Sequence, residues 1–372
     1  MTRRTELLLD GLAYVESPRW HDDRLWFSHW GTEEIVAVDL DGTSEIVGRG
    51  PAGFGWATEW LPDGRMLLTG PELLREEPDG TMVRHADLGP ITGRGWAEIV
   101  VKDNGNAYVN SINFDFMGGE RPQSPPGIVA LVTPDGAARQ VADGIAFPNG
   151  MVITPDGSTL ILSESFTGRL LAFDIAPDGG LANRRVWAEG VGPDGIRLDA
   201  EGCIWTHDPA TRSAARVREG GEIVERIPVE KDLFATMLGG PDGRTLFLML
   251  AEWAGVENAE AQIAKRTGEV RIAHVDVPHA GRPQGSIVAR TVSARRPQLR
   301  RTPGWLPCRR PRAHHRQPEA PQRGRRAHGH PRRGPGDAAG HRHRPHPDEQ
   351  RQRDVHAAAR VAGTDRLGPG HR

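Results

Sequence analysis

Four oxygen-bearing side chains stand at matching places in a repeated sequence pattern, which is the arrangement that a shared cation site needs. Five of the six repeats contain a turn that ends in Gly, and counting eight residues back from three of these glycines gives a common position. From Gly105, Gly157 and Gly202 the count reaches Ala97 (with Glu98 beside it), Asn149 and Asp194. In the first repeat Glu16, six residues before Asp22, takes the corresponding place, and in two further repeats the count reaches Trp56 and Ala235.

The chemistry of this set is that of a hard cation. Three carboxylates and an amide (Glu16, Glu98, Asp194 and Asn149) are costly to bury together unless a positive charge compensates them. Oxygen donors suit Ca²⁺, Mg²⁺ or Mn²⁺ better than a structural zinc. Two other interpretations stay open: the acids cap strand ends in water, and Asn149-Gly150 and Asp194-Gly195 are ordinary turn pairs.

The elements that must position these side chains are short strands joined by tight turns. A turn followed by an apolar run recurs six times, for example in LPDGRMLLTG (61–70) and GPDGRTLFLML (240–250), and a second series of six turns alternates with it. The turn glycines of the first series lie about 41 to 52 residues apart, a period typical of four-stranded propeller blades. We therefore predict an all-β fold, a six-bladed β-propeller with four-stranded blades over residues 1–283. The first strand of each blade would line the central channel.

Two segments interrupt the strand pattern. EWAGVENAEAQIAK (252–265) is the best helical candidate, as an insertion in the last blade. FDFMGGERPQSPPG (114–127) has the Pro and Gly content of an ordered loop. Such a loop either shapes a site or is a passive connector. Trp96 and Phe147 likewise either wall a substrate or pack the channel mouth.

The last part of the chain, 284–372, differs in composition from the rest. Residues 1–283 carry 26 Lys and Arg against 43 Asp and Glu, whereas residues 284–372 carry 21 Arg against 6 acids. The segment is rich in Arg, Pro, Gly, Ala and His and has too few apolar side chains to offset its ordering entropy, so we predict disorder. A basic nucleic-acid-binding arm is one interpretation. We favour the interpretation that the segment is extraneous, because it resembles the translation product of GC-rich DNA read in a shifted frame.

The apolar runs, the N-terminal residues and the cysteines limit the expected cellular location and cysteine chemistry. The longest apolar runs are well short of 18 residues, and the N-terminus lacks a signal-peptide pattern, so a cytoplasmic protein with no membrane partner is expected. Cys203 and Cys308 lie far apart in different compositional regions, which predicts neither a disulfide framework nor a cysteine metal site.

Three motifs together resemble the SMP-30/gluconolactonase/LRE-like family, also called the regucalcin type. They are VESPRW (15–20), FPNGMVITPDG (147–157) and GPDGIRLDAEGCIW (192–205), in order and at blade spacing, and the resemblance covers about residues 12–283. It implies that Glu16, Asn149 and Asp194 bind one divalent metal ion. Ca²⁺ is favoured, with Zn²⁺, Mg²⁺ or Mn²⁺ as alternatives. The implied activity is hydrolysis of a small lactone of the sugar type.

The chain also departs from the family pattern. Ala97-Glu98 replaces an Asn-Asp pair, so the Asn function is lost and Glu98 is left to replace the Asp. Arg94 stands one residue out of register with a substrate-binding arginine. Ser17 replaces a Gly, and His29 stands where an acid is often found. These changes concern the substrate more than the metal.

The expected reaction is metal-assisted attack of water on an ester carbonyl. Asp194 is the expected base and Glu98 the alternative, while Glu98, Arg94 and Trp96 are the candidate substrate contacts. A serine esterase is disfavoured because the sequence lacks a Gly-x-Ser-x-Gly elbow, and His207 is interpreted as a core histidine. An organophosphate or strictosidine-synthase-like hydrolase and a non-catalytic calcium-binding propeller stay open, since fold alone does not set function.

Overall fold

Antiparallel sheets of four strands, each in chain order, form most of this computed structural model, which describes residues 3–281. The predicted disordered segment 284–372 lies outside the described residues. Four of the sheets are separate. The first contains β2 (Val15–His21), β3 (Arg24–His29), β4 (Glu34–Val38) and β5 (Ser44–Arg49), and the second β6 (Thr58–Trp60), β7 (Met66–Leu68), β8 (Leu73–Glu76) and β9 (Met82–Ala86). The third contains β10 (Ile99–Val101), β11 (Ala107–Ser111), β12 (Gly127–Val132) and β13 (Ala138–Ile145), and the fourth β14 (Pro148–Ile153), β15 (Thr159–Glu164), β16 (Arg169–Ile175) and β17 (Leu181–Glu189).

The other eight strands form one continuous sheet. Its order is β1 (Glu6–Leu12), β24 (Gly268–His274), β23 (Thr245–Ala251), β22 (Asp232–Gly239), β18 (Gly192–Leu198), β19 (Ile204–Asp208), β20 (Ser213–Val217) and β21 (Ile223–Pro228). The prediction of six separate four-stranded blades is therefore wrong in number. The physical reason lies at Gly195, which pairs with Ala235 in parallel. A Cβ on Gly195 would stand 2.3 Å from the Ala235 Cβ, so only Gly lets β18 approach β22 so closely.

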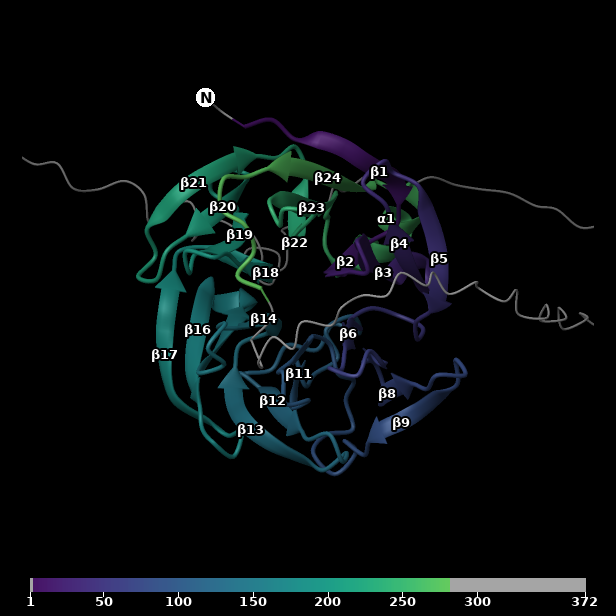
Figure 1. The fold of residues 1–372 in the computed structure, drawn as a ribbon, viewed down its shortest axis with the longest axis vertical. Coiled ribbons are helices and arrows are strands. Elements are labelled where there is room, and N and C mark those ends of the chain that lie inside the picture. The colour runs from purple at the N-terminus through teal and green to yellow at the C-terminus, as the bar shows by residue number, and fades with distance from the viewer. Residues whose placement is uncertain (1–2, 282–372) are drawn as a thin grey trace, which may run out of the picture. The chain divides into compact units, whose positions relative to one another are not determined.

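The sheets are arranged around a common centre as in a propeller (Figure 1). Strands β2, β6, β14, β18 and β22 lie towards that centre, and β5, β9, β13, β17 and β21 lie at the rim. The apolar runs between turns are buried on both faces, as predicted: each of the residues of β12 is buried, and hydrophobic clusters lie between neighbouring sheets. The turns have the expected backbone, with φ at +89° for Gly64 and +69° for Gly157.

Helices are few and short in the part of the chain that is described. The segment 252–265 is helical in its second half, where the 3₁₀ helix η3 (Val256–Asn258) leads into α1 (Ala259–Lys265). Two other 3₁₀ turns, η1 (Trp30–Thr32) and η2 (Ser165–Thr167), follow the second strands of their sheets. None of the helices described in residues 3–281 has the length and apolar character needed to cross a bilayer.

Candidate metal and acid site on the channel axis

Two neighbouring inner strands bring Asn149 and Asp194 together. Asn149 lies on β14 and Asp194 on β18, and the Asn149 Nδ2 donates a hydrogen bond to the Asp194 Oδ1. The turn interpretation of the two residue pairs is wrong, because both lie inside strands. Gly150 is required for a different reason: a Cβ there would stand 2.6 Å from the Asp194 carbonyl oxygen. The glycines that follow the two polar residues thus allow close strand packing.

Glu16 on β2 joins this pair from the first sheet. Its side chain is buried, with the whole residue only 2% exposed. One carboxylate oxygen, Oε2, accepts the Ser17 backbone N–H, whereas Oε1 is buried and has no hydrogen-bond partner among the described residues. Burial, followed by the negative charges of Asp194 and Glu98, raises the pKa of Glu16 well above its ordinary value.

Asp194 has the same kind of environment. Burial, together with the charge of Glu98, raises the pKa of Asp194 to about 7, while the nearness of Glu16 and the hydrogen bond from Asn149 act in the opposite direction. The residue nevertheless keeps some exposed surface, unlike Glu16. Two neighbouring carboxyls with elevated pKa values favour any partner that brings positive charge, whether a proton or a cation.

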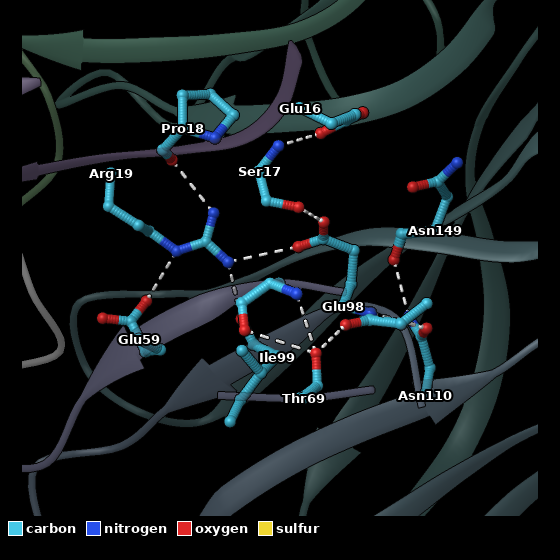
Figure 2. A network of polar contacts seen from close by, with 12 residues as sticks. Glu16, Ser17, Pro18, Arg19, Glu59, Thr69, Glu98, Ile99, Asn110 and Asn149 are labelled. Carbon is cyan, nitrogen blue, oxygen red and sulfur yellow. Dashed lines mark hydrogen bonds and ion pairs between the residues drawn. The ribbon is translucent and has the colours of Figure 1, made fainter. Parts of the chain in front are cut away.

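Glu98 is close enough to influence both acids, but its own oxygens are engaged elsewhere. It directly precedes β10, and Figure 2 shows its carboxylate between Ser17 and Arg19. The Ser17 hydroxyl donates to Oε1, and the Arg19 Nη2 lies 3.1 Å from Oε2. The Glu98 backbone N–H donates to the Asn110 Oδ1 at 3.2 Å. Glu98 is therefore held on the β2 side of the axis by a fixed set of donors.

Arg19 anchors this arrangement. Its guanidinium also binds the Glu59 Oε2 at 3.0 Å, the Pro18 carbonyl at 2.9 Å and the Ile99 carbonyl at 3.0 Å (Figure 2). The side chain is only 13% exposed, so these contacts replace its hydration. Arg19 consequently ties the inner strands of three sheets together directly beneath the acids.

Sequence reasoning missed Ser17, Arg19 and Asn110. Asn110 is fully buried near the end of β11, where its Nδ2 donates to the Asn149 carbonyl at 2.7 Å and so holds β14 against β11. The sequence contains a signal for Arg19 and Asn110. Arg19 is a charged residue within a strand whose neighbours are buried, and Asn110 is a polar residue that follows the apolar run AYV. Such groups are buried only when they have partners.

Of the three candidate substrate contacts, Glu98 lies near the acids, whereas Arg94 and Trp96 do not join the axial group. Arg94 lies in an exposed segment, where its Nη2 binds the Glu120 Oε2 at 3.0 Å across the 114–127 loop. Trp96 is 1% exposed and belongs to a hydrophobic cluster with Leu67 and Ala130. Its position agrees with the packing role that the sequence left open. His207 is largely buried, which lowers its pKa.

The donor set fits one divalent cation. Within residues 3–281 no group of three or more His, Cys, Asp and Glu forms a metal-binding cluster, so the candidate set is two acids and one amide. The oxygens of this set come from the unpartnered Glu16 Oε1, the Asp194 carboxylate and the Asn149 amide. The Asn149 Nδ2 now faces Asp194, and a rotation of the amide by 180° brings its oxygen to that side instead. Carboxylate and amide oxygens are the ligands that Ca²⁺ and Mg²⁺ prefer.

The two ends of the inner strands differ. Glu16, Asn149 and Asp194 lie in the first half of their strands. A cavity of about 60 Å³ lies at the other end, lined by residues further along the same strands, among them Trp20, Ile153 and Met237. Arg19 and Glu59 also line it. The acids and this cavity are thus separated along the channel by the Arg19 contacts.

Comparison with known proteins is consistent with this geometry. Residues 14–252 match the model of the SMP-30/gluconolactonase/LRE-like region. Among solved structures, a luciferin-regenerating enzyme aligns with a TM-score of 0.64 and 15% identity, covering 74% of this chain and 97% of that chain. A calcium-binding regucalcin from Agrobacterium tumefaciens gives 0.61 and 19%, covering 76% and 96%. A gluconolactonase from Xanthomonas campestris gives 0.57 and 20%, covering 74% and 90%.

Proposed function

The chain belongs to the SMP-30/gluconolactonase/LRE-like family, and from this membership and the axial site we propose that it is a metal-dependent hydrolase that opens a small lactone. The observation that carries the proposal is the convergence of Glu16, Asn149 and Asp194 with one buried carboxylate oxygen unpartnered among the described residues. A small lactone or ester in the cytoplasm is the proposed substrate. Neither a membrane nor a nucleic acid is part of the proposal.

Each site residue has a distinct proposed role. Glu16, Asn149 and Asp194 hold one divalent ion, with Ca²⁺ favoured because every donor is oxygen. When bound, the ion supplies Lewis-acid polarisation of the ester carbonyl and stabilises negative charge on its oxygen. Asp194 accepts the proton of the attacking water, and its partial exposure gives water access. The amide of Asn149 adds no charge, which keeps the site electrophilic.

Glu98 is the weaker candidate for the base. Both of its carboxylate oxygens are engaged, one by Ser17 and one by Arg19. An ion pair with Arg favours the ionised carboxylate but makes proton uptake harder. We therefore assign Glu98 to the electrostatics and the support of the site, where its charge acts on Glu16 and Asp194.

The test is metal removal and restoration. The full chain is stripped with a chelator and assayed on a lactone panel, with Ca²⁺, Mg²⁺, Mn²⁺ or Zn²⁺ restored in turn. Loss on stripping and recovery with one ion are expected. Asp194→Asn is expected to lower kcat by about 100-fold or more, whereas the exposed control Asp178→Asn leaves it unchanged. Turnover that survives complete metal removal contradicts the proposal.

A calcium-binding propeller without catalysis is the second candidate. The all-oxygen donor set favours it as much as it favours an enzyme. Tight Ca²⁺ binding by calorimetry, lost in Glu16→Gln, combined with no turnover on lactones, esters or organophosphates, would select it.

A further inference from the structure

Aromatic side chains gather in two clusters beside the axial acids. The phenylalanine cluster has ring centroids 4.5 to 6.3 Å apart and consists of Phe114, Phe116, Phe147 and Phe166. The tyrosine–tryptophan cluster has centroids 5.3 to 6.2 Å apart and consists of Tyr14, Trp30, Phe54, Phe234 and Trp253. The two clusters together contain nine aromatic rings, with the contacts made within each cluster, and they form a large apolar area.

Both clusters belong to the acid end of the inner strands. Phe147 stands two residues before Asn149, and Tyr14 stands two residues before Glu16. Phe234 directly precedes Ala235, the residue that pairs with Gly195. The 60 Å³ cavity is lined instead by residues further along these strands, so it marks the opposite end. The aromatic clusters therefore belong to the same end of the inner strands as the proposed catalytic group.

Part of this aromatic surface faces solvent. Phe166 is 55% exposed and Trp253 is 36% exposed, one in each cluster. Exposed large apolar side chains grouped near polar site residues are typical of ligand contacts.

The charged side chains nearby are engaged with other groups. Arg94 is paired with Glu120, and the guanidinium of Arg121 lies 5.4 Å from the Phe116 ring centroid. Ala97, at the register position shared with Asn149, has only a methyl group, and Gly55 beside it has no side chain. At these positions the chain thus offers rings and methyl groups in places where a polyhydroxylated ligand needs hydrogen-bond donors.

We propose that the substrate is a lactone or ester with an apolar alkyl or aryl substituent, which packs against Phe166 and Trp253 while its carbonyl lies at the acids. This inference rests on the proposed hydrolase function and narrows its substrate class away from bare sugar lactones. Burial of each methylene is favourable, so a few methylenes on the rings raise apparent affinity about 10-fold or more.

The test compares lactones with a common ring. The full chain is assayed with the restored metal on δ-valerolactone, on δ-decalactone, which adds a pentyl chain, and on glucono-δ-lactone. The expected kcat/KM for δ-decalactone exceeds that for δ-valerolactone by about 10-fold or more, and glucono-δ-lactone is the poorest substrate.

Three variants identify the surface responsible. Phe166→Ser is expected to lower the decalactone-to-valerolactone ratio of kcat/KM by at least about 5-fold, and Phe166→Leu to keep most of it. Ile46→Ser is the matched control, because Ile46 is similarly exposed but lies on the outer strand β5. It is expected to leave both rates unchanged.

The outcomes separate this inference from the proposed function. Turnover with preference for glucono-δ-lactone, or an unchanged ratio in Phe166→Ser, overturns the substrate class and leaves the hydrolase standing. If no lactone is turned over, the hydrolase fails, and calorimetry with 2-pentyltetrahydropyran then decides: binding that Phe166→Ser removes supports the aromatic site, and no binding overturns it. A shift of sedimentation from dimer to monomer in Phe166→Ser, with selectivity unchanged, assigns the surface to a second copy and also overturns the proposal.

Discussion

At the scale of single residues, the acids on the axis make stability depend on pH. The pKa of Asp194 is raised to about 7, and that of Glu16 is raised well above its ordinary value. Between about pH 4 and pH 7 the metal-free folded state therefore keeps protons that the unfolded chain has released. The contribution of these two acids to the unfolding free energy therefore falls as pH rises through this range, whereas histidines with lowered pKa, such as His29 and His207, contribute in the opposite direction. In chelated protein, the change in Tm from pH 5 to pH 8 is expected to be more negative in the parent chain than in Asp194→Asn, which keeps the histidines and lacks one of the two acids.

The same experiment contains its own controls. Asp194→Asn removes one of the two raised groups, so the change in its Tm between pH 5 and pH 8 should be less negative. The exposed Asp178→Asn should follow the parent chain. Added Ca²⁺ should stabilise more at pH 8 than at pH 5, because ligation requires ionised carboxylates. An identical change in Tm from pH 5 to pH 8 in Asp194→Asn and in the parent chain would refute this account of the pair.

His29 shows how a departure from the family pattern can keep a structural role. Its Nε2 accepts the Ala13 backbone N–H at 2.8 Å. In the fourth sheet the Glu164 Oε1 accepts the Ala146 backbone N–H at 3.0 Å. Each accepted N–H belongs to the residue three before one of the axial site residues, Glu16 or Asn149. The imidazole nitrogen thus replaces a carboxylate oxygen as an acceptor, which is consistent with the lowered pKa of His29.

At the scale of elements, the Arg19 contacts predict a large stability effect. Arg19→Ala leaves Glu59 and Glu98 without their shared cation in a largely buried place, which costs about 3 to 5 kcal/mol of unfolding free energy. Arg19→Lys keeps the charge but loses the fork of donors, so an intermediate loss is expected. Urea unfolding measures both.

An exposed ion pair provides the comparison for Arg19. Arg139 pairs with Asp178 at 2.9 Å with both side chains well exposed, so Arg139→Ala should cost about 1 kcal/mol or less. Equal losses in Arg19→Ala and Arg139→Ala would show that the buried contacts add nothing.

The close approach of β18 and β22 predicts a second element-scale effect. In Gly195→Ala the new Cβ would stand 2.3 Å from the Ala235 Cβ and 2.8 Å from its Cα. The strands must separate, at a cost of about 1 to 3 kcal/mol, and Asp194 moves with them. Differential scanning calorimetry and the lactone assay should both register a loss.

Gly93→Ala is the control for this substitution, since a Cβ at Gly93 meets no atom within 4 Å. It should leave the Tm and kcat close to those of the parent chain. A parent-like Tm for Gly195→Ala would mean that the two strands separate without cost.

The register of the repeats made part of the site predictable. Because hairpin turns fix the distance from Gly157 to Asn149 and from Gly202 to Asp194, counting along the chain located both residues on inner strands. The contacts of Arg19 with Glu59 and Glu98 join different sheets at sequence separations of 40 and 79, which no local pattern encodes. The continuous eight-stranded sheet could not be predicted either, because it depends on the close approach of β18 and β22 that Gly195 permits by having no side chain.

At the scale of the whole described unit, the ring is closed by the N-terminal strand. β1 pairs with β24 from Glu6↔Ile272 to Leu12↔Gly268, and Leu8 and Leu9 pack on a core shared with β2 and β23. A chain lacking residues 1–12 leaves β24 as an uncovered edge and removes that packing. Its Tm is expected to fall by at least about 5 °C, or the protein to aggregate.

A chain that lacks only residues 1–2 is the matched control, and its Tm should stay at the parent value because β1 remains intact. Equal Tm values for the two truncated chains would show that β1 does not hold the ring.

The β1–β24 pairing also sets an order of events during synthesis. The strand β1 leaves the ribosome more than 250 residues before its partner β24, which follows on the order of 10 to 50 s later. Throughout that interval the backbone N–H and C=O groups of Glu6–Leu12 lack the β24 strand with which they pair in the folded protein. During this period β1 is open to pairing with other chains, so ribosome-associated chaperones would protect the nascent chain most by covering this strand.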